Sequence, residues 1–127
     1  MGVKFLSEEW AEEVTKAVNS DEAFQAAAGR HTAKIQNVVS TPEGEKKYFF
    51  TLEGGRAQLS IGEIEGPDAT ISQDYQTAMA LAKSELSGTA AFMSGKVRVA
   101  GDLMKLMQMQ GVFSTLPRAI STIDVEY

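Results

Sequence analysis

His31 is the only histidine in the chain, so any catalysis that needs an imidazole base must use it. A histidine-activated nucleophile is not supported, because the chain has no cysteine and no G-x-S-x-G motif to present a serine. A zinc site would need further nitrogen or sulfur ligands, which the sequence lacks. A lone histidine before an expected strand is usually a surface or turn residue. The sequence therefore predicts no catalytic residue, no metal, no cofactor and no enzymatic activity.

A group of carboxylates near the N-terminus offers a second candidate for chemistry. It consists of Glu8, Glu9, Glu12 and Glu13. Their spacing places them on the exposed side of an expected helix, where the first two favour the positive end of the helix dipole. A solvated helix face explains this group better than a metal site does.

The segment Ser94-Gly95-Lys96-Val97 resembles the end of a phosphate-binding loop. It lacks the required Ser or Thr after the lysine, and Gly88 lies too far upstream to complete the motif. The nucleotide-binding interpretation is therefore rejected.

A methionine-rich stretch is the most unusual feature of the C-terminal third. Its apolar members are Leu103, Met104, Leu106, Met107 and Met109. They span more of a helix than one narrow stripe, so the helix is expected to be covered on more than one side. Two interpretations remain open from the pattern alone. The helix is either an ordinary core helix or one wall of a cavity, where adaptable methionines suit ligands of varied shape.

The whole chain is acidic, with 17 Asp and Glu against 12 Lys and Arg in 127 residues. This balance disfavours nucleic acid as a partner, because such binding normally needs a basic surface. No signal-peptide pattern or apolar run long enough to span a bilayer occurs. The length suits a single domain over residues 1–127, and the default location is cytoplasmic.

Hydrophobic periodicity divides the first half of the chain into helices followed by strands. Residues 7–19 and 21–28 follow a helical period, with Ser7 as a cap for the first helix and Gly29 as the end of the second. A period of two then predicts strands over 33–39, 47–53 and 57–62. The pair Gly54-Gly55 is a two-residue hairpin signal.

The second half mixes the two patterns. A short strand is expected over 68–72, then a helix capped by Ser72 or Asp74, and a further strand over 96–100. Asp102 is expected to cap the methionine-rich helix, and Pro117 to interrupt the last helical segment. This order predicts an α+β fold with helices packed on one face of a largely antiparallel sheet.

Two segments resemble the sterol carrier protein 2 family, also called the SCP-2 sterol transfer family. One is Pro67-Asp68-Ala69-Thr70-Ile71-Ser72 with the helix that follows. The other runs from Ala91 to Leu103 and contains Gly95-Lys96 and Gly101-Asp102. The order of elements over almost the whole chain also agrees with that family.

The resemblance implies a five-stranded, mostly antiparallel sheet, helices over one face, and an apolar tunnel between them. It further implies non-catalytic intracellular binding and transfer of a fatty acyl chain, an acyl-CoA or a sterol-like lipid, with transient membrane contact. An alternative stays open, because some relatives of this kind serve as accessory domains. In that case the interior is filled, and an exposed apolar face supports oligomerisation, including a homodimer.

The tunnel interpretation assigns ligand-binding residues to the sheet face and to the helices above it, without assigning residues to a lipid headgroup. The candidates are Phe50, Leu52, Leu59, Ile61, Met79, Phe92, Leu103, Met104, Met107, Phe113, Leu116 and Ile120.

Overall fold

The computed structural model of the chain describes residues 2–29, 31–83 and 85–126 and contains one five-stranded sheet. Its strands are β2 (Ala33–Thr41), β3 (Gly44–Glu53), β4 (Arg56–Ile61), β5 (Ala69–Asp74) and β6 (Val97–Gly101). They lie in the order β4-β3-β2-β5-β6, and β2 and β5 form the parallel pair among antiparallel neighbours. The predicted mostly antiparallel, five-stranded sheet is confirmed.

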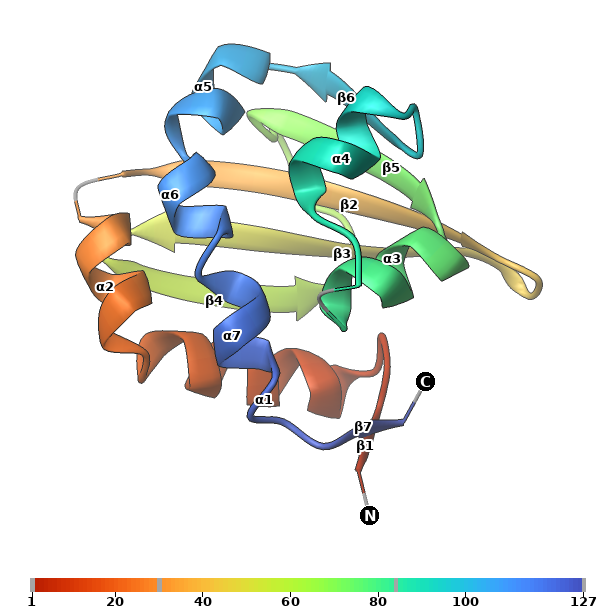
Figure 1. Cartoon of the computed structure of the whole chain (residues 1–127), viewed down its shortest axis with the longest axis horizontal. Coiled ribbons are helices and arrows are strands. Elements are labelled where there is room, and N and C mark those ends of the chain that lie inside the picture. Colours follow the sequence, from red (N-terminus) through yellow and green to blue (C-terminus); the bar gives the residue numbers. More distant parts are fainter. Residues whose placement is uncertain (1, 30, 84, 127) are drawn as a thin grey trace.

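The helices gather on one face of this sheet, as predicted (Figure 1). They are α1 (Glu8–Asn19), α2 (Glu22–Ala28), α3 (Tyr75–Ala82), α4 (Gly88–Met93), α5 (Leu103–Gln108), α6 (Gln110–Phe113) and α7 (Leu116–Ile120). The interruption expected at Pro117 lies just before it, between α6 and α7. No helix in the described part of the chain is long and apolar enough to cross a membrane.

Side-chain caps set the starts of helices α1 to α5. Ser7 accepts a hydrogen bond from the amide of Trp10, and Asp21 accepts one from the amide of Phe24. Of the two caps considered for α3, Asp74 is the one used, with its Oδ1 2.7 Å from the Thr77 nitrogen. Such caps satisfy amides that would otherwise lack an intrahelical partner.

A short parallel pair that the sequence does not predict joins the two ends of the chain. It consists of β1 (Val3–Lys4) and β7 (Val125–Glu126). Strands of two residues carry too little alternation to be recognised by their pattern.

Alternation along the strands directs apolar side chains toward the helices. Ile35 pairs with Phe50, which in turn pairs with Leu59, so three large apolar side chains form one row across the inner face. Gly54 and Gly55 make the predicted tight turn, with φ of 59° and 79°. These positive values are the ones that glycine adopts without a steric cost.

Helix α1 covers the free edge of β4 with hydrogen bonds from its side chains. Asn19 donates from Nδ2 to the Ala57 carbonyl at 2.9 Å and accepts from the Ala57 amide at 2.8 Å. The Thr15 hydroxyl oxygen accepts from the Leu59 amide at 2.9 Å. Because an unpaired strand edge can pair with other chains, these contacts protect the sheet.

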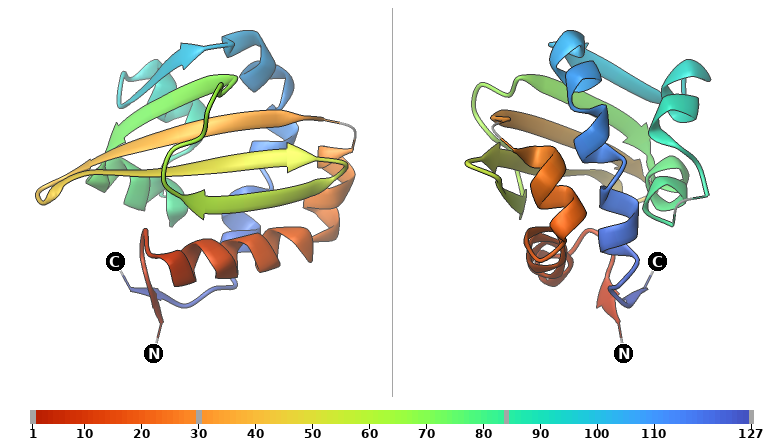
Figure 2. Two further views of the ribbon diagram at one scale, coloured as in Figure 1. Left: turned by 180° about the vertical axis from the view of Figure 1, so that it is seen from behind. Right: turned by 60° about the vertical axis from the view of Figure 1, so that its left-hand side comes forward.

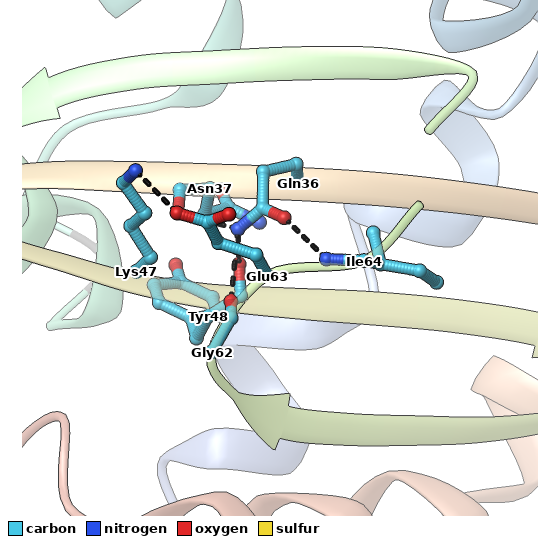
Figure 3. A network of polar contacts seen from close by, with 7 residues as sticks. All are labelled: Gln36, Asn37, Lys47, Tyr48, Gly62, Glu63 and Ile64. Atoms are coloured by element: carbon cyan, nitrogen blue, oxygen red, sulfur yellow. Dashed lines mark hydrogen bonds and ion pairs between the residues drawn. The ribbon is translucent and has the colours of Figure 1, made fainter. Parts of the chain in front are cut away.

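The opposite, outer face of the sheet is crossed by the β4–β5 connection, residues 62–68 (Figure 2). Gln36 holds this connection in place (Figure 3). Its Nε2 donates to the carbonyls of Tyr48 and Gly62 at 3.1 and 3.0 Å, and its Oε1 accepts from the Ile64 amide at 2.8 Å. An ion pair between Lys47 and Glu63, 2.6 Å apart, fastens the same connection from outside.

The two segments that carry the family resemblance meet at the start of β5. Gly101 has a φ of 105°, and a Cβ there would lie 2.6 Å from the Asp68 carbonyl oxygen. The Asp68 carboxylate accepts from the Lys34 amide at 2.8 Å and lies 3.1 Å from the Lys105 ammonium. These motif residues therefore have structural roles that explain their types.

Candidate functional site

A cavity of about 870 Å³ lies between the inner face of the sheet and the helices. Volumes of this order are typical of small-molecule sites. The walls are mostly apolar, and none of the described lining residues is Asp, Glu, Lys, Arg or His. Such a cavity favours an apolar ligand over a charged one, because an unpaired charge is costly to remove from water.

Eight of the twelve candidate residues line this cavity. They are Phe50, Leu59, Phe92, Leu103, Met107, Phe113, Leu116 and Ile120. Sheet and helices thus contribute opposite walls, although the chain separates Phe50 and Ile120 by 70 residues.

The other four candidates lie outside the lining. Leu52 is fully buried in the hydrophobic core, and Met79 is partly buried and packs against that core. Ile61 and Met104 are exposed to solvent instead. Alternation in strands and the helical period predict which face of an element a residue lies on. They do not predict where along that face the cavity lies, because this depends on tertiary packing.

Helix α1 supplies a wall that was not among the candidates. Trp10, Val14 and Val18 line the cavity, and so does Phe5, which precedes the helix. The apolar stripe of this helix was visible in the sequence. Its packing against β4 was not, since that contact depends on the order of the strands.

The expectation that the methionine-rich helix is covered on more than one side is wrong. Its buried residues, Leu106 and Met109, are three positions apart on one face, and Leu103, Met104 and Met107 are exposed. Met109 is completely buried, whereas Met104 and Met107 are 64% and 58% exposed. Leu106 and Met107 line the cavity, while Met109 belongs to the core. The two interpretations of this stretch thus apply to different residues within it.

Exposed apolar side chains mark one side of the cavity as open. Phe92 of α4 and Leu103 and Met107 of α5 both line the cavity and are exposed to solvent. Met93 beside them is 81% exposed. We call the five residues Phe92, Met93, Leu103, Met104 and Met107 the apolar rim.

One end of the cavity carries aromatic and polar groups. The Trp10 ring makes edge contacts with the rings of Phe5 and Tyr48, with centroids 5.1 and 5.3 Å apart. Burial raises the pKa of the Tyr48 phenol to about 12, so this hydroxyl is neutral at physiological pH. Asn37 of β2 and Gln73 of β5 also line the cavity, and their side chains lie on the inner face of the sheet. None of the three was a candidate.

A smaller depression of about 460 Å³ lies beside the N-terminal helix. Its lining mixes apolar residues with charged ones, including Glu13, Lys16 and Asp124. Because charged residues share this lining, the larger apolar cavity is the better candidate site.

His31 lies outside the cavity lining, and its backbone amide donates to the Ala28 carbonyl at 2.8 Å. No group of three or more His, Cys, Asp or Glu side chains that could hold a metal ion occurs among residues the structure describes.

The fold therefore defines a class of protein in which one sheet and a helical layer enclose an apolar cavity. The SCP-2 sterol transfer family matches residues 9–114, and the chain belongs to this family. A crystal structure of sterol carrier protein 2 has the same fold, with a TM-score of 0.80 and 22% identity over 94% of this chain and 99% of that one. The solution structure of palmitated SCP2L2 from Aedes aegypti covers 94% of this chain and 95% of its own, with a TM-score of 0.59 and 19% identity.

Sequence comparison also finds a longer protein that contains a similar segment. Stomatin-like protein 1 of Mus musculus is 32% identical over 81 residues, which cover 63% of this chain and 20% of that protein. The chain thus spans about a fifth of the length of the curated relatives it matches.

Proposed function

We propose that this chain is a non-catalytic lipid-binding and transfer domain whose cavity holds a fatty acyl chain, an acyl-CoA or a sterol-like lipid. The observation that carries the proposal is the cavity of about 870 Å³, which is lined mostly by apolar side chains and, in its described part, by no charged one. The family of the chain supports the same function. The palmitate carried by an SCP2-like protein of the same fold makes an acyl chain a reasonable first ligand.

Burial of the lipid chain supplies the binding free energy. Each buried methylene contributes about 0.8 kcal/mol, so a tail of about 14 methylenes gains roughly 11 kcal/mol. The loss of ligand freedom opposes binding by several kcal/mol, which leaves a dissociation constant on the order of micromolar. Selectivity for tail length should be low, because burial of methylenes is not directional.

The apolar rim is the proposed route for the lipid. Three of its side chains, Phe92, Leu103 and Met107, are exposed to solvent and also belong to the cavity wall, so they offer a lipid tail an apolar path into the cavity. Transient contact of the rim with a membrane would let this happen without exposing the tail to water. Methionines suit this position, because their flexible side chains can adapt to a moving ligand.

Native mass spectrometry of the purified protein, with organic extraction of the same sample, tests the proposal. We expect a co-purifying lipid, or uptake of one equivalent of palmitate or palmitoyl-CoA. Ala82→Phe should reduce uptake about tenfold, since Ala82 lines the cavity. Ala80→Phe on the same helix is the matched control, because Ala80 is outside the lining. A wild-type protein that stays empty after incubation with both lipids would contradict the proposal.

A second candidate function is an interaction module. The exposure of Met93 and Met104, which do not line the cavity, favours it, as does the larger size of the relatives. In this case the rim would bind another protein surface or a second copy of the chain. A mass that rises with concentration in sedimentation experiments, together with a lack of lipid uptake, would favour this function over transfer.

A further inference from the structure

We infer that Gln73 selects neutral lipids that carry a hydroxyl group, and that this group enters the cavity instead of staying at the rim. This inference rests on the proposed function and narrows its ligand class.

Gln73 lies on β5 with its side chain in the wall of the cavity. It is 8% exposed, and its Oε1 is buried without a hydrogen-bond partner. A buried amide oxygen that lacks a partner is costly, and most such groups in native proteins are paired. The oxygen exposes less than 1 Å² of surface, so a ligand donor must displace a neighbouring side chain to reach it and restore the missing hydrogen bond.

The strand register shows that polarity is confined to one end of the inner face. The rows through Leu52 and Phe50 contain apolar residues and glycine only. The next row contains Tyr48 and Asn37. The row after it contains Gln73 and also Lys46, which is half-buried but is not part of the described cavity lining. A lipid tail therefore finds its best environment beside the Phe50 row, whose members Ile35, Phe50 and Leu59 line the cavity, with a polar atom of the same lipid near Gln73.

Trp10 adds a second unsatisfied group at this end. Its Nε1 is buried without a hydrogen-bond partner, and its ring contacts Tyr48 edge to face. The end of the cavity thus offers an indole donor, a phenol and two amides, all of them neutral.

The chemistry of these groups distinguishes between ligand headgroups. A hydroxyl can donate to one amide oxygen and accept from an amide or indole N–H, so it matches both kinds of group. A carboxylate can only accept, and it brings a charge into a wall that lacks a described cationic residue. A plain alkane would leave the Gln73 oxygen unpaired. The cavity should therefore rank a long-chain alcohol above the alkane and above the fatty acid anion.

The fluorescence of Trp10 provides a direct readout, because it is the only tryptophan and lines the cavity. The protein is titrated at pH 8 with 1-dodecanol, dodecane and dodecanoate delivered from cyclodextrin, and each affinity is corrected for the carrier. Wild type should bind dodecanol about tenfold more tightly than dodecane, the effect of one hydrogen bond to a buried amide. It should bind dodecanoate more weakly than dodecanol.

Gln73→Met keeps the length of the side chain and removes the amide. We expect this substitution to bring the ratio of the dodecanol affinity to the dodecane affinity close to one. Gln110→Met is the matched control, because Gln110 also lines the cavity but is exposed to water, and the ratio should stay at its wild-type value. A ratio unchanged in Gln73→Met, or dodecanoate binding at least as tight as dodecanol, would overturn the inference and leave lipid binding itself intact. If none of the three ligands binds, both the inference and the proposed function are wrong.

Discussion

Two buried glutamines on opposite faces of the sheet have opposite surroundings. Gln36 on the outer face is 6% exposed and makes hydrogen bonds through both atoms of its amide. Gln73 on the inner face is 8% exposed, yet its oxygen has no partner. The same residue type at nearly the same degree of burial therefore serves structure on one face and is left without a partner on the other.

The difference shows that buried polar groups have different roles on the two faces of the sheet. The outer face uses its buried amide to fix the connection between β4 and β5, which must pass over β3 and β2 to reach its place (Figure 2). The inner face carries a buried amide oxygen that lacks a partner, in the wall of a mostly apolar cavity. A polar group without an internal partner lowers stability, and natural proteins accept this cost mainly at functional sites.

The largest effect is expected on the outer face. Gln36→Met removes the acceptor for Ile64 and the donor to Tyr48 and Gly62, so the free energy of unfolding should fall by about 2–3 kcal/mol. Urea unfolding followed by circular dichroism measures this change. Gln58→Met, at an exposed position of β4, is the control and should stay within about 0.5 kcal/mol of wild type. Equal effects of the two substitutions would show that the hydrogen bonds of Gln36 do not contribute specifically to stability.

The inner face should respond in the opposite direction. Gln73→Met replaces an unpaired buried amide by an apolar side chain of similar length, so the free energy of unfolding should rise by about 1 kcal/mol. The same urea experiment in the absence of lipid tests this. A clear loss of stability would mean that Gln73 is a structural residue like Gln36.

Acid should lower the stability of the fold through two carboxylates at the ends of β5, the strand that carries Gln73. Hydrogen bonds from the amides of Lys34 and Thr77 hold the pKa values of Asp68 and Asp74 below the ordinary carboxyl range. A lowered pKa in the folded state stabilises the fold above the ordinary value, and this contribution is lost as the pH falls through the folded value. Unfolding free energy should therefore decline between about pH 4 and pH 2.

Asp74→Asn tests the charge of Asp74 independently of its role as a helix cap. Asparagine is neutral but can still accept the hydrogen bond from the Thr77 amide. The variant's free energy of unfolding should fall less than that of wild type between pH 6 and pH 3. Identical acid dependence in the two proteins would show that the folded-state pKa of Asp74 does not contribute.

The smallest effect concerns the ion pair on the outer connection. The hydrogen bond with Glu63 raises the pKa of Lys47, and the same bond lowers the pKa of Glu63. Both side chains are exposed to solvent, and such pairs add little to stability. Glu63→Gln should change the urea midpoint far less than Gln36→Met and should lose its effect at high salt. An effect as large as that of Gln36→Met would show that the ion pair, and not the Gln36 amide, is the main contact that holds the β4–β5 connection.

Local patterns were enough to predict most of the fold. Caps such as Ser7 and Asp102, the glycine turn at 54–55 and the period of two in the strands depend on neighbouring residues only. The parallel pairing of β5 with β2 depends on contacts between distant segments and was not predicted. The single domain over residues 1–127 and the cytoplasmic location stay predictions.

The site was harder to predict than the fold. The expected strand over 68–72 ended one residue before Gln73, whereas β5 continues to Asp74. That difference hid the alternation that turns Gln73 toward the helices. Met104 and Met107 look equivalent in the sequence, and packing decides that only Met107 lines the cavity.

The central claim is that lipid binds between the inner face and the helices. Methionine methyl NMR tests it directly, because Met107 lines the cavity while Met93 is exposed outside it. With methyl-labelled protein and 1-dodecanol, we predict intermolecular contacts and shift changes at Met107 and little change at Met93. Changes confined to Met93 and Met104 would contradict the claim and place the lipid on the outer surface of the rim.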